Sequence, residues 1–274
     1  TQKMAREHAI IKDLKAVESL GCVSVICSDK TGTLTQNKMT VQQIYMNHKV
    51  YEPREFNISD QTQRYLLYDA VLNNDSSIVD GKGIGDPTEY ALLEMLRNIY
   101  VDAGTFFDET EIHEDVLRRN MERLEEVPFD SDRKLMSSKY LLHGVPTILT
   151  KGAVDVLLDR CTHVRSCNVI HPMTEQEKDK IRRQNEIFSQ NGLRVLAFAY
   201  KESDEVLSPD TEYGFIFLGM VSMVDPPRPE SMEAVASAKR AGIRPVMITG
   251  DHKITAVAIA RQIGIYEEGD LALT

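Results

Sequence analysis

Two sequence units of the same layout lie near opposite ends of the chain, and together they limit the folds that it can adopt. Each runs from an amphipathic helix pattern into an apolar strand and then into a loop rich in Thr, Gly and Asp. The helix patterns cover residues 3–20 and 231–241, and the strands cover residues 23–27 and 244–248. A further helix follows the second loop, with Ala256, Ile259, Ala260 and Ile263 on one face. Such units become neighbours in one parallel sheet, with both loops at one edge, so we expect an α/β domain formed from both ends of the chain.

The long middle segment has a different pattern. Alternating apolar stretches such as Leu193–Tyr200 are interleaved with helices that open on capping sequences at Asp86–Glu89 and Thr174–Glu177. This pattern indicates an α+β domain inserted into a loop of the α/β domain. We therefore expect residues 1–40 and 221–274 to form the α/β domain and residues 41–220 to form the insertion.

Composition and charge exclude several classes of protein. A chain of 274 residues favours two domains over one. With 42 Asp and Glu against 32 Lys and Arg, the formal net charge is -10, so no nucleic-acid partner is expected. The four cysteines follow no disulfide pattern, as is typical of a reducing cytosol. No signal peptide is visible and the longest apolar run, Gly214–Val224, is too short to span a bilayer, so we expect a soluble polypeptide.

The strongest candidate for chemistry is Asp29, within the sequence ICSDKTGTLT of residues 26–35. Asp, Thr and Gly are ordinary turn residues, so a turn alone would explain the loop. A carboxylate at a strand tip, with Lys30 and the hydroxyls of Thr31 and Thr33 beside it, can also attack a phosphoryl group and hold its oxygens. Thr31 occupies the position where a phosphatase would have a second acid as its general base. A phosphorylated Asp29 is therefore expected to persist, which suits an energy-storing intermediate.

A second candidate is a zinc site formed by Cys161, His163, Cys167 and His171. Cys and His are the usual zinc ligands, but the spacing C-x-H-x3-C-x3-H is not a familiar one. Buried cysteines and surface histidines are the preferred interpretation.

Five motifs resemble one family in content and order. The run ICSDKTGTLTQNKMTV contains DKTGT, and GDPTE, KGA, DPPRPE and MITGD follow at residues 85–89, 151–153, 225–230 and 247–251. They resemble the P-type ATPases over nearly the whole chain, and most closely the calcium-transporting pumps of the bacterial type. The resemblance implies a haloacid-dehalogenase-like α/β fold. Its Rossmann-type parallel sheet, incomplete in this polypeptide, would carry a large inserted α+β domain built on an antiparallel sheet.

The resemblance also assigns roles in phosphoryl transfer. Asp29 would be the phosphorylated nucleophile, the Thr31 carbonyl would share a magnesium ion with it, and Lys30 would add positive charge. The remaining catalytic candidates are Thr249, Gly250 and Asp251, which would contact the transferring phosphate, and Asp225 and Arg228, which would line the hinge and nucleotide side. For Arg228 the alternative is a solvated turn residue after two prolines.

The inserted domain would bind ATP. By resemblance, Phe129 stacks on adenine, Glu89 bonds near the adenine amino group, Lys151 lies in the pocket beside Gly152, and Arg194 reaches the phosphates. Each has an alternative from the residues alone. Glu89 would only complete its capping box, Phe129 would be core, and Lys151 and Arg194 would be solvated charges at strand ends.

One position departs from the family's pattern. Calcium pumps often carry an arginine two residues after the stacking phenylalanine, where this chain has Ser131. Arg133 or Lys134 could partly replace that charge.

The overall expectation is ATP-driven cation transport, with Ca2+ as the favoured ion, through an aspartyl-phosphate intermediate. The chain would be the cytosolic headpiece of an integral protein of the bacterial plasma membrane, with ATP and Mg2+ as its ligands and the cation bound by membrane helices outside this sequence. Because the resemblance also expects aspartates beyond Thr274, we expect this polypeptide alone to form almost no phosphoenzyme. Two alternatives remain open: a soluble phosphatase of the haloacid dehalogenase class, and a nucleotide-binding module without catalysis.

Overall fold

The computed structural model describes residue 6 and residues 21–57, 59–79, 82–97, 99, 114–251 and 253–273. These residues form two compact units: one extends over Lys38–Pro226, and the other combines the residues up to Asn37 with those from Pro227 onward. The helix expected over residues 3–20 lies outside the described residues, apart from position 6.

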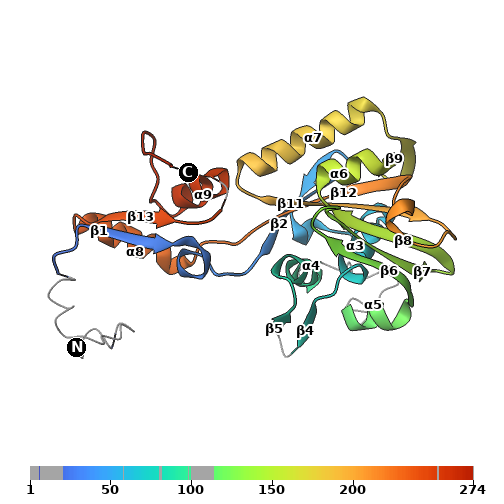
Figure 1. Ribbon diagram of the computed structural model, residues 1–274, viewed down its shortest axis with the longest axis horizontal. Helices are drawn as coiled ribbons and strands as arrows, with labels where there is room; N and C mark the ends of the chain where they lie inside the picture. Colours follow the sequence, from blue (N-terminus) through green and yellow to red (C-terminus); the bar gives the residue numbers. More distant parts are fainter. Residues whose placement is uncertain are drawn as a thin grey trace. The chain divides into compact units, whose positions relative to one another are not determined.

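The smaller unit contains a parallel strand pair taken from both ends of the chain. Strand β1 (Val25–Asp29) pairs with β13 (Arg244–Ile248), with Asp29 opposite Ile248, so the predicted neighbours are confirmed (Figure 1). A π-helical turn, η1 (Lys30–Leu34), follows β1, and helices α8 (Pro229–Arg240) and α9 (Lys253–Gln262) precede and follow β13. The first strand begins and ends two residues later than expected, so Asp29 is its last residue rather than part of the loop.

The apolar residues of the smaller unit are less buried than their pattern suggests. Val25 is 46% exposed and Ile26 is 42% exposed, because β1 pairs only with β13 among the described strands. On α8, Val235 is buried whereas Met232, expected on the same face, is exposed. On α9 the expected face is confirmed at Ile259 and Ala260, which are buried.

The larger unit is built on a mostly antiparallel sheet, with nine strands among the described residues. Seven of them follow the order β10-β9-β12-β11-β8-β7-β6. Strand β12 also pairs with β2, which pairs in turn with β3, so β9 (parallel) and β2 (antiparallel) both bond to β12. The strands are β2 (Thr40–Met46), β3 (Lys49–Tyr51), β6 (Arg123–Asp130), β7 (Leu135–Leu142), β8 (Val145–Gly152), β9 (Cys161–Ser166), β10 (Val169–Pro172), β11 (Arg194–Glu202) and β12 (Phe215–Val224). A separate hairpin joins β4 (Ser77–Val79) to β5 (Lys82–Ile84). The architecture is thus mixed α/β with an antiparallel sheet.

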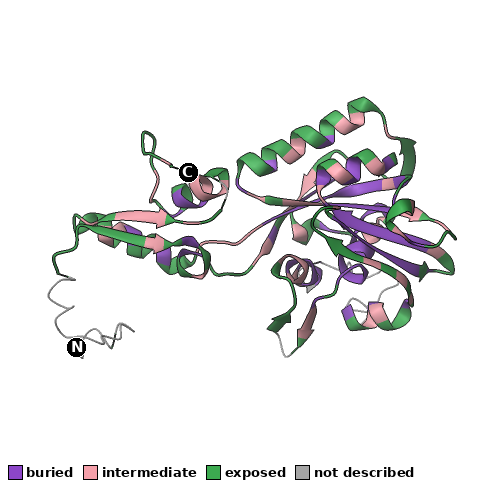
Figure 2. Ribbon diagram, in the orientation of Figure 1, coloured by how far each residue is buried: buried purple, intermediate pink, exposed green. Residues whose placement is uncertain are grey.

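Helices cover both faces of this sheet. On one face lie α3 (Gln61–Leu72), α4 (Pro87–Arg97) and α5 (Glu114–Asn120), and on the other α6 (Val154–Arg160) and α7 (Glu175–Gln190) (Figure 1). Short 3-10 turns cover Pro53–Glu55 and Pro209–Thr211. The central strands are accordingly buried on both sides (Figure 2).

Alternation in β11 therefore separates two cores rather than core from solvent. Phe198 and Tyr200 pack into the core under α3, while Ala197 and Ala199 face the core under α6 and α7. All four are buried, because a strand in the middle of a doubly covered sheet has no solvent face.

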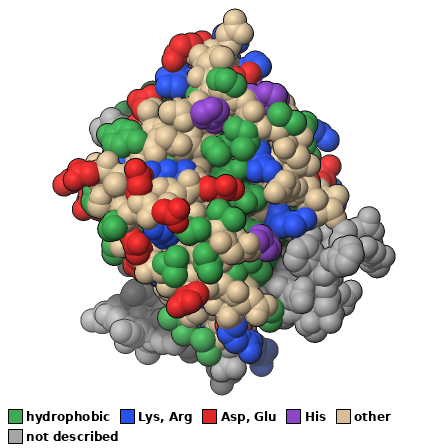
Figure 3. Space-filling view, turned by 90° about the vertical axis from the view of Figure 1, so that its right-hand side faces the viewer, with side chains coloured by type: hydrophobic (Ala, Val, Ile, Leu, Met, Phe, Trp, Pro, Cys, Tyr) green, Lys and Arg blue, Asp and Glu red, His purple; other side chains and the backbone are tan. Residues whose placement is uncertain are grey.

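The residues considered for zinc do not come together as a site. Cys161 is buried at the start of β9, where burial raises the pKa of its thiol, whereas Cys167 is exposed in the β9–β10 turn. The described residues contain no group of three His, Cys, Asp or Glu side chains placed to hold a metal ion. Nor does any described helix combine the length and apolarity needed to cross a bilayer. On the described surface drawn in Figure 3, acidic and basic side chains are interspersed.

Candidate functional site

The loop after β1 directs Asp29 and Lys30 to opposite environments. Asp29 is exposed, whereas Lys30 is 7% exposed. The chain reverses through Gly32, whose φ of +74° favours glycine, and closes with a bond from the Thr35 amide to the Lys30 carbonyl. The Thr35 hydroxyl donates to the same carbonyl and accepts from the Gly32 amide. The buried hydroxyl of Thr35 thus fixes the turn that follows Asp29.

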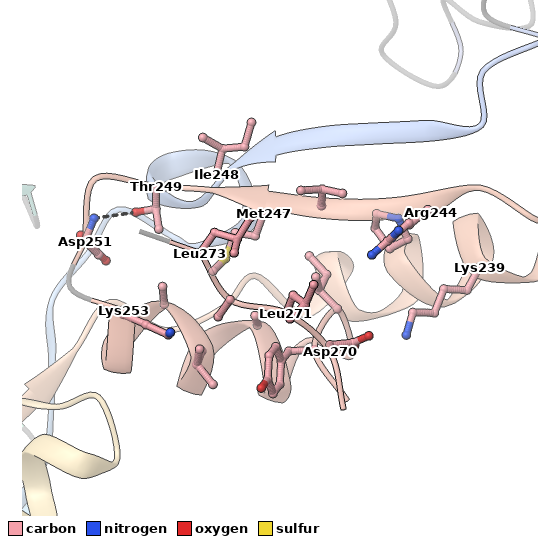
Figure 4. A pocket seen from close by; sticks show the side chains of 18 residues that line it. Lys239, Arg244, Met247, Ile248, Thr249, Asp251, Lys253, Asp270, Leu271 and Leu273 are labelled. Carbon is pink, nitrogen blue, oxygen red and sulfur yellow. Dashed lines mark hydrogen bonds between the residues drawn. The ribbon is translucent and has the colours of Figure 1, made fainter. Parts of the chain in front are cut away.

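The loop after β13 meets this turn. Lys30 forms an ion pair with Asp251. The Asp251 amide donates to the Thr249 hydroxyl at 3.1 Å (Figure 4). Because Asp29 and Ile248 are register partners, Thr249, Gly250 and Asp251 follow directly at the strand end beside Asp29. Two loops predicted to share a sheet edge therefore do so, and they bring two carboxylates, an ammonium group and hydroxyls together.

Arg228 holds the other side of the first loop. Its guanidinium donates to the Gly32 carbonyl at 3.0 Å and its amide donates to the Leu34 carbonyl at 2.9 Å. The hydroxyl of Ser231, on the first turn of α8, donates to Leu34 as well. Arg228 is exposed, but it is tied to the loop rather than merely solvated.

Asp225 belongs to the larger unit. Its carboxylate accepts a hydrogen bond from the Lys38 amide at 3.0 Å, which joins the first residue of that unit to the residue before its last, Pro226.

A cavity of about 560 Å³ lies between β13, α9 and the segment 270–273 (Figure 4). Its lining includes Met247, Val257, Leu271 and Leu273, with Thr249 and Asp251 at one end. Asp29 is not among its lining residues, whereas Lys239, Arg244 and Lys253 are.

In the larger unit, the buried Lys151 forms an ion pair with the half-buried Glu89. Lys151 is 4% exposed and its ammonium lies 2.6 Å from the Glu89 carboxylate; it also donates to the Asn73 carbonyl. Burial lowers the pKa of Lys151, and the charge of Glu89 opposes that effect. A solvated lysine at a strand end is therefore the wrong interpretation.

Glu89 has partners that a capping residue would not have. Its second oxygen accepts from the Asp75 amide at 3.0 Å and from the Ser76 hydroxyl at 3.5 Å, while Asp86 alone caps α4 through the amide of Thr88. The capping sequence is real, but the Glu89 side chain points to the Asn73–Ser76 segment. At Thr174 the predicted cap is confirmed, because its hydroxyl accepts from the Glu177 amide.

Phe129 is 63% exposed near the end of β6, so it is not a core residue. The turn that follows it contacts the KGA segment: the Lys134 carbonyl accepts from the Ala153 amide at 3.1 Å. A Cβ on Gly152 would lie 2.2 Å from that carbonyl, so the close approach requires glycine. The exposed aromatic ring and the ion pair are thereby connected through the backbone.

Arg194 lies at the start of β11 and donates to the Thr88 hydroxyl at 2.8 Å. The exposed guanidinium thus sits at the first turn of α4, next in sequence to Glu89. Strands β8 and β11 and helix α4 bring Arg194, Lys151 and Glu89 to one region of the larger unit.

The expectation that Arg133 replaces a missing charge near phosphate is not supported. Its side chain is 11% exposed and forms an ion pair with Glu212, a fully buried residue. Lys134 is exposed, with a φ of +56°.

Two residues of this region were missed by the sequence interpretation. The first is Asp69, in the middle of the apolar helix α3, which is completely buried. Asn73 connects Asp69 to Lys151. The second is Glu212. A lone acid in an apolar run was a visible signal. Glu212 gave none, since it lies in a polar loop where acids are common.

Comparison with known proteins decides the family. A family profile described as P-type ATPase, cytoplasmic domain N, matches residues 62–230, more than half of the chain. The chain belongs to the P-type ATPases. The calcium-transporting ATPase 1 of Bacillus cereus is 45% identical over 97% of this chain, and the protein of the same name from Lactococcus lactis is 45% identical over all of it. The sodium/potassium-transporting ATPase subunit alpha-4 of Rattus norvegicus is 34% identical over 98%.

These P-type ATPases are much longer proteins. The chain spans 29%, 30% and 28% of the three relatives, respectively. The family that the motif order suggested is confirmed by the family profile and by 45% identity along the whole chain.

Proposed function

We propose that this chain is the ATP-binding and phosphorylation headpiece of a calcium-transporting P-type ATPase. The observation that carries the proposal is the β1–β13 register, which puts the DKTGT and TGD loops at one edge of a parallel sheet. The smaller unit would have the haloacid-dehalogenase-like fold of a phosphorylation domain, and the larger unit would be the nucleotide-binding domain.

The reaction assigned to the smaller unit is phosphoryl transfer to Asp29. A carboxylate oxygen of Asp29 forms a bond to the γ-phosphorus of ATP as the bond from that phosphorus to the β–γ bridging oxygen breaks, and ADP leaves with the electron pair. Lys30 and Arg228 would stabilise charge on the transferring group, and Thr249, Gly250 and Asp251 would contact its oxygens. A bound phosphoryl group would compete with Asp251 for Lys30, since both are anionic.

The donor set beside Asp29 fits a magnesium ion. Asp29 is exposed, and carboxylate and backbone carbonyl oxygens are the ligands that Mg2+ prefers. The Asp29 carboxylate and the Thr31 carbonyl would hold the ion, which when bound neutralises charge on the phosphoryl oxygens. Asp251 already compensates the buried Lys30.

The role assigned to the larger unit is binding of the adenine nucleotide. Phe129 would stack on the base, because an exposed aromatic ring near the end of a strand can offer a face to it. Glu89 and Lys151 would form the polar wall of the pocket beside Gly152, and Arg194 would reach the phosphates. Asp225, at the point where the chain leaves this unit, would act at the hinge.

Calcium is the proposed ion because the relatives at 45% identity are calcium-transporting ATPases, whereas the sodium/potassium pump reaches 34%. The cation would bind to membrane helices of the intact pump, with this chain on the cytosolic side of a bacterial plasma membrane.

The test is phosphoenzyme formation in the full-length pump that the proposal implies. Asp29→Asn keeps the shape of the side chain but removes the attacking charge. Acid-stable label from γ-labelled ATP should disappear in Asp29→Asn, while the affinity for ATP is retained. Label that persists in this variant would place the nucleophile elsewhere.

A further inference from the structure

Glu212 is a buried carboxylate that receives hydrogen bonds from three side chains. It lies between β11 and β12 with no exposed surface. One oxygen accepts from Arg133 and from the Ser137 hydroxyl at 2.5 Å, and the other accepts from Arg160 at 3.2 Å. A buried carboxylate is costly unless it is paired and hydrogen-bonded, and these three donors offset the cost of burying Glu212.

The two arginines bound to Glu212 contact different segments of the chain. Arg160, on α6, also donates to the Glu212 carbonyl at 3.4 Å and lies over the ring of Tyr213, with 5.1 Å from its guanidinium carbon to the ring centroid. Its contacts therefore stay with the loop that contains Glu212. Arg133 instead belongs to the β6–β7 turn.

Arg133 joins Glu212 to the residue that precedes Phe129. One guanidinium nitrogen contacts Glu212 and the other donates to the carbonyl of Pro128. The Arg133 amide donates to the Asp130 carboxylate at 2.8 Å. A planar guanidinium can hold two acceptors at once in a fixed geometry, so Arg133 fixes the start of the turn to a buried group.

The end of the same turn is fixed by the KGA segment, through the bond from the Ala153 amide to the Lys134 carbonyl. Phe129 itself is 63% exposed, so its own side-chain packing does little to hold it. Its backbone position depends instead on the contacts of Pro128, Asp130 and Lys134.

We propose that Glu212 is a positioning residue for nucleotide binding, which acts through Arg133 to hold the turn 128–134 and thereby orients Phe129 toward the base. This rests on the proposed function, in which Phe129 stacks on adenine. Glu212 stands in no motif of the sequence, and its role follows from the Glu212–Arg133–Pro128 chain of contacts.

The test is a double-mutant cycle read by calorimetric titration with ATP. Arg133→Lys keeps the charge but cannot bridge Glu212 and Pro128, and Glu212→Gln keeps the shape but removes the charge. Each should weaken ATP binding about tenfold, as expected for loss of a charge-assisted bond. In a Phe129→Ala background the same changes should weaken it less than twofold, because the group they position is gone.

Two controls separate positioning from general damage. Arg160→Lys disturbs the same carboxylate without touching the turn, and it should leave ATP affinity within twofold of wild type. Tripolyphosphate, which has no base, should bind all the variants equally. If Glu212→Gln does not fold, as thermal unfolding would show, Arg133→Lys carries the test, since its side chain lies at the edge of the cluster.

The outcomes distinguish this proposal from the one on which it rests. Equal losses with and without Phe129, or no loss in Arg133→Lys, would overturn the positioning role and leave the nucleotide site in place. If Phe129→Ala binds ATP as well as wild type, the stacking assignment fails and the positioning role fails with it.

Discussion

Asp69 and Lys151 are joined through one residue, Asn73. The Asn73 side chain donates to the Asp69 carboxylate at 2.9 Å, and the Asn73 carbonyl accepts from the Lys151 ammonium. The second oxygen of Asp69 is buried and is paired with no donor among the residues that the structure describes. The Asp69 carboxyl group is therefore linked through Asn73 to the Lys151–Glu89 pair, in buried surroundings that disfavour a negative charge on Asp69.

The first prediction concerns the pH dependence of stability. Burial raises the pKa of Asp69 from 3.8 to about 7, against the hydrogen bond from Asn73 and the charge of Lys151. The folded state therefore binds this proton more tightly than the unfolded state. The contribution of protonated Asp69 to the free energy of unfolding is fully present below about pH 4. It is lost as the pH rises to about 7, by about 1.4 kcal/mol per pH unit.

Asp69→Asn cannot ionise and so isolates this contribution. The stability of Asp69→Asn relative to wild type should increase between pH 4 and pH 7 and stay constant above that, as measured by urea unfolding at several pH values. Parallel pH profiles for the two proteins would contradict a raised pKa at Asp69.

The second prediction concerns Phe129. Phe129→Ala should weaken ATP binding by about 1 to 3 kcal/mol, by analogy with stacking of bases on aromatic residues. Its unfolding temperature should hardly change, because the ring is largely exposed. Val206, another exposed apolar residue of the same unit, provides the control: calorimetry should find equal ATP affinity for Val206→Ala and wild type.

The third prediction concerns the ion pair of Lys151 and Glu89. Glu89→Ala leaves Lys151 buried without its carboxylate, so the free energy of unfolding should fall by about 3 to 5 kcal/mol. The pKa of Lys151 should fall further, since the charge that opposes its burial is lost. Glu94 pairs with the more exposed Lys38, so Glu94→Ala should lower the free energy of unfolding by about 1 kcal/mol or less. If Glu89→Ala and Glu94→Ala lowered the free energy of unfolding equally, the Lys151–Glu89 pair would contribute no more to stability than an exposed pair.

The fourth prediction separates two reasons for glycine. A Cβ on Gly152 would meet the Lys134 carbonyl, whereas one on Gly144 would meet nothing within 4 Å, although its φ is +83°. Gly144→Ala should therefore cost about 1 kcal/mol of strain. Gly152→Ala should cost more and also weaken ATP binding, because the turn of Phe129 must shift. Urea unfolding and titration with ATP measure the two effects, and equal behaviour of the variants would contradict the close contact.

Local patterns predicted the elements with strong periodicity or caps. The β13 strand, the cap at Thr174 and the parallel pairing of β1 with β13 all follow from apolar spacing and turn residues. The burial of β11 on both faces did not follow, because alternation looks the same whether the second face meets solvent or another helix layer. Burial of Lys151 likewise depends on Glu89, which lies far away in the sequence.

The candidate site was predicted where residues are adjacent in a motif, and missed where they act through tertiary contacts. Asp29 ends β1, and Thr249 and Asp251 stand in the loop after β13; all three belong to recognisable motifs that meet at one sheet edge. Their catalytic roles stay predictions until the Asp29→Asn experiment is done. On charge alone, Arg133 was one of two candidates to replace the missing arginine, but its side chain pairs with Glu212, which local sequence cannot indicate.

The pairing of β2 with β12 means that the sheet of the larger unit cannot be completed until late in synthesis. The strand β2 is made early, and the two strands meet across 179 residues, as in the bond from Ser222 to Gln43. At 5 to 20 residues per second, β2 waits about 10 to 35 s after its own synthesis before β12 exists, with only the short β3 beside it. The strand β1 waits longer still, for β13. The nascent chain therefore carries two early strands whose main partners arrive last, and it is in this interval that association with other chains, or protection by a chaperone, has most to act on.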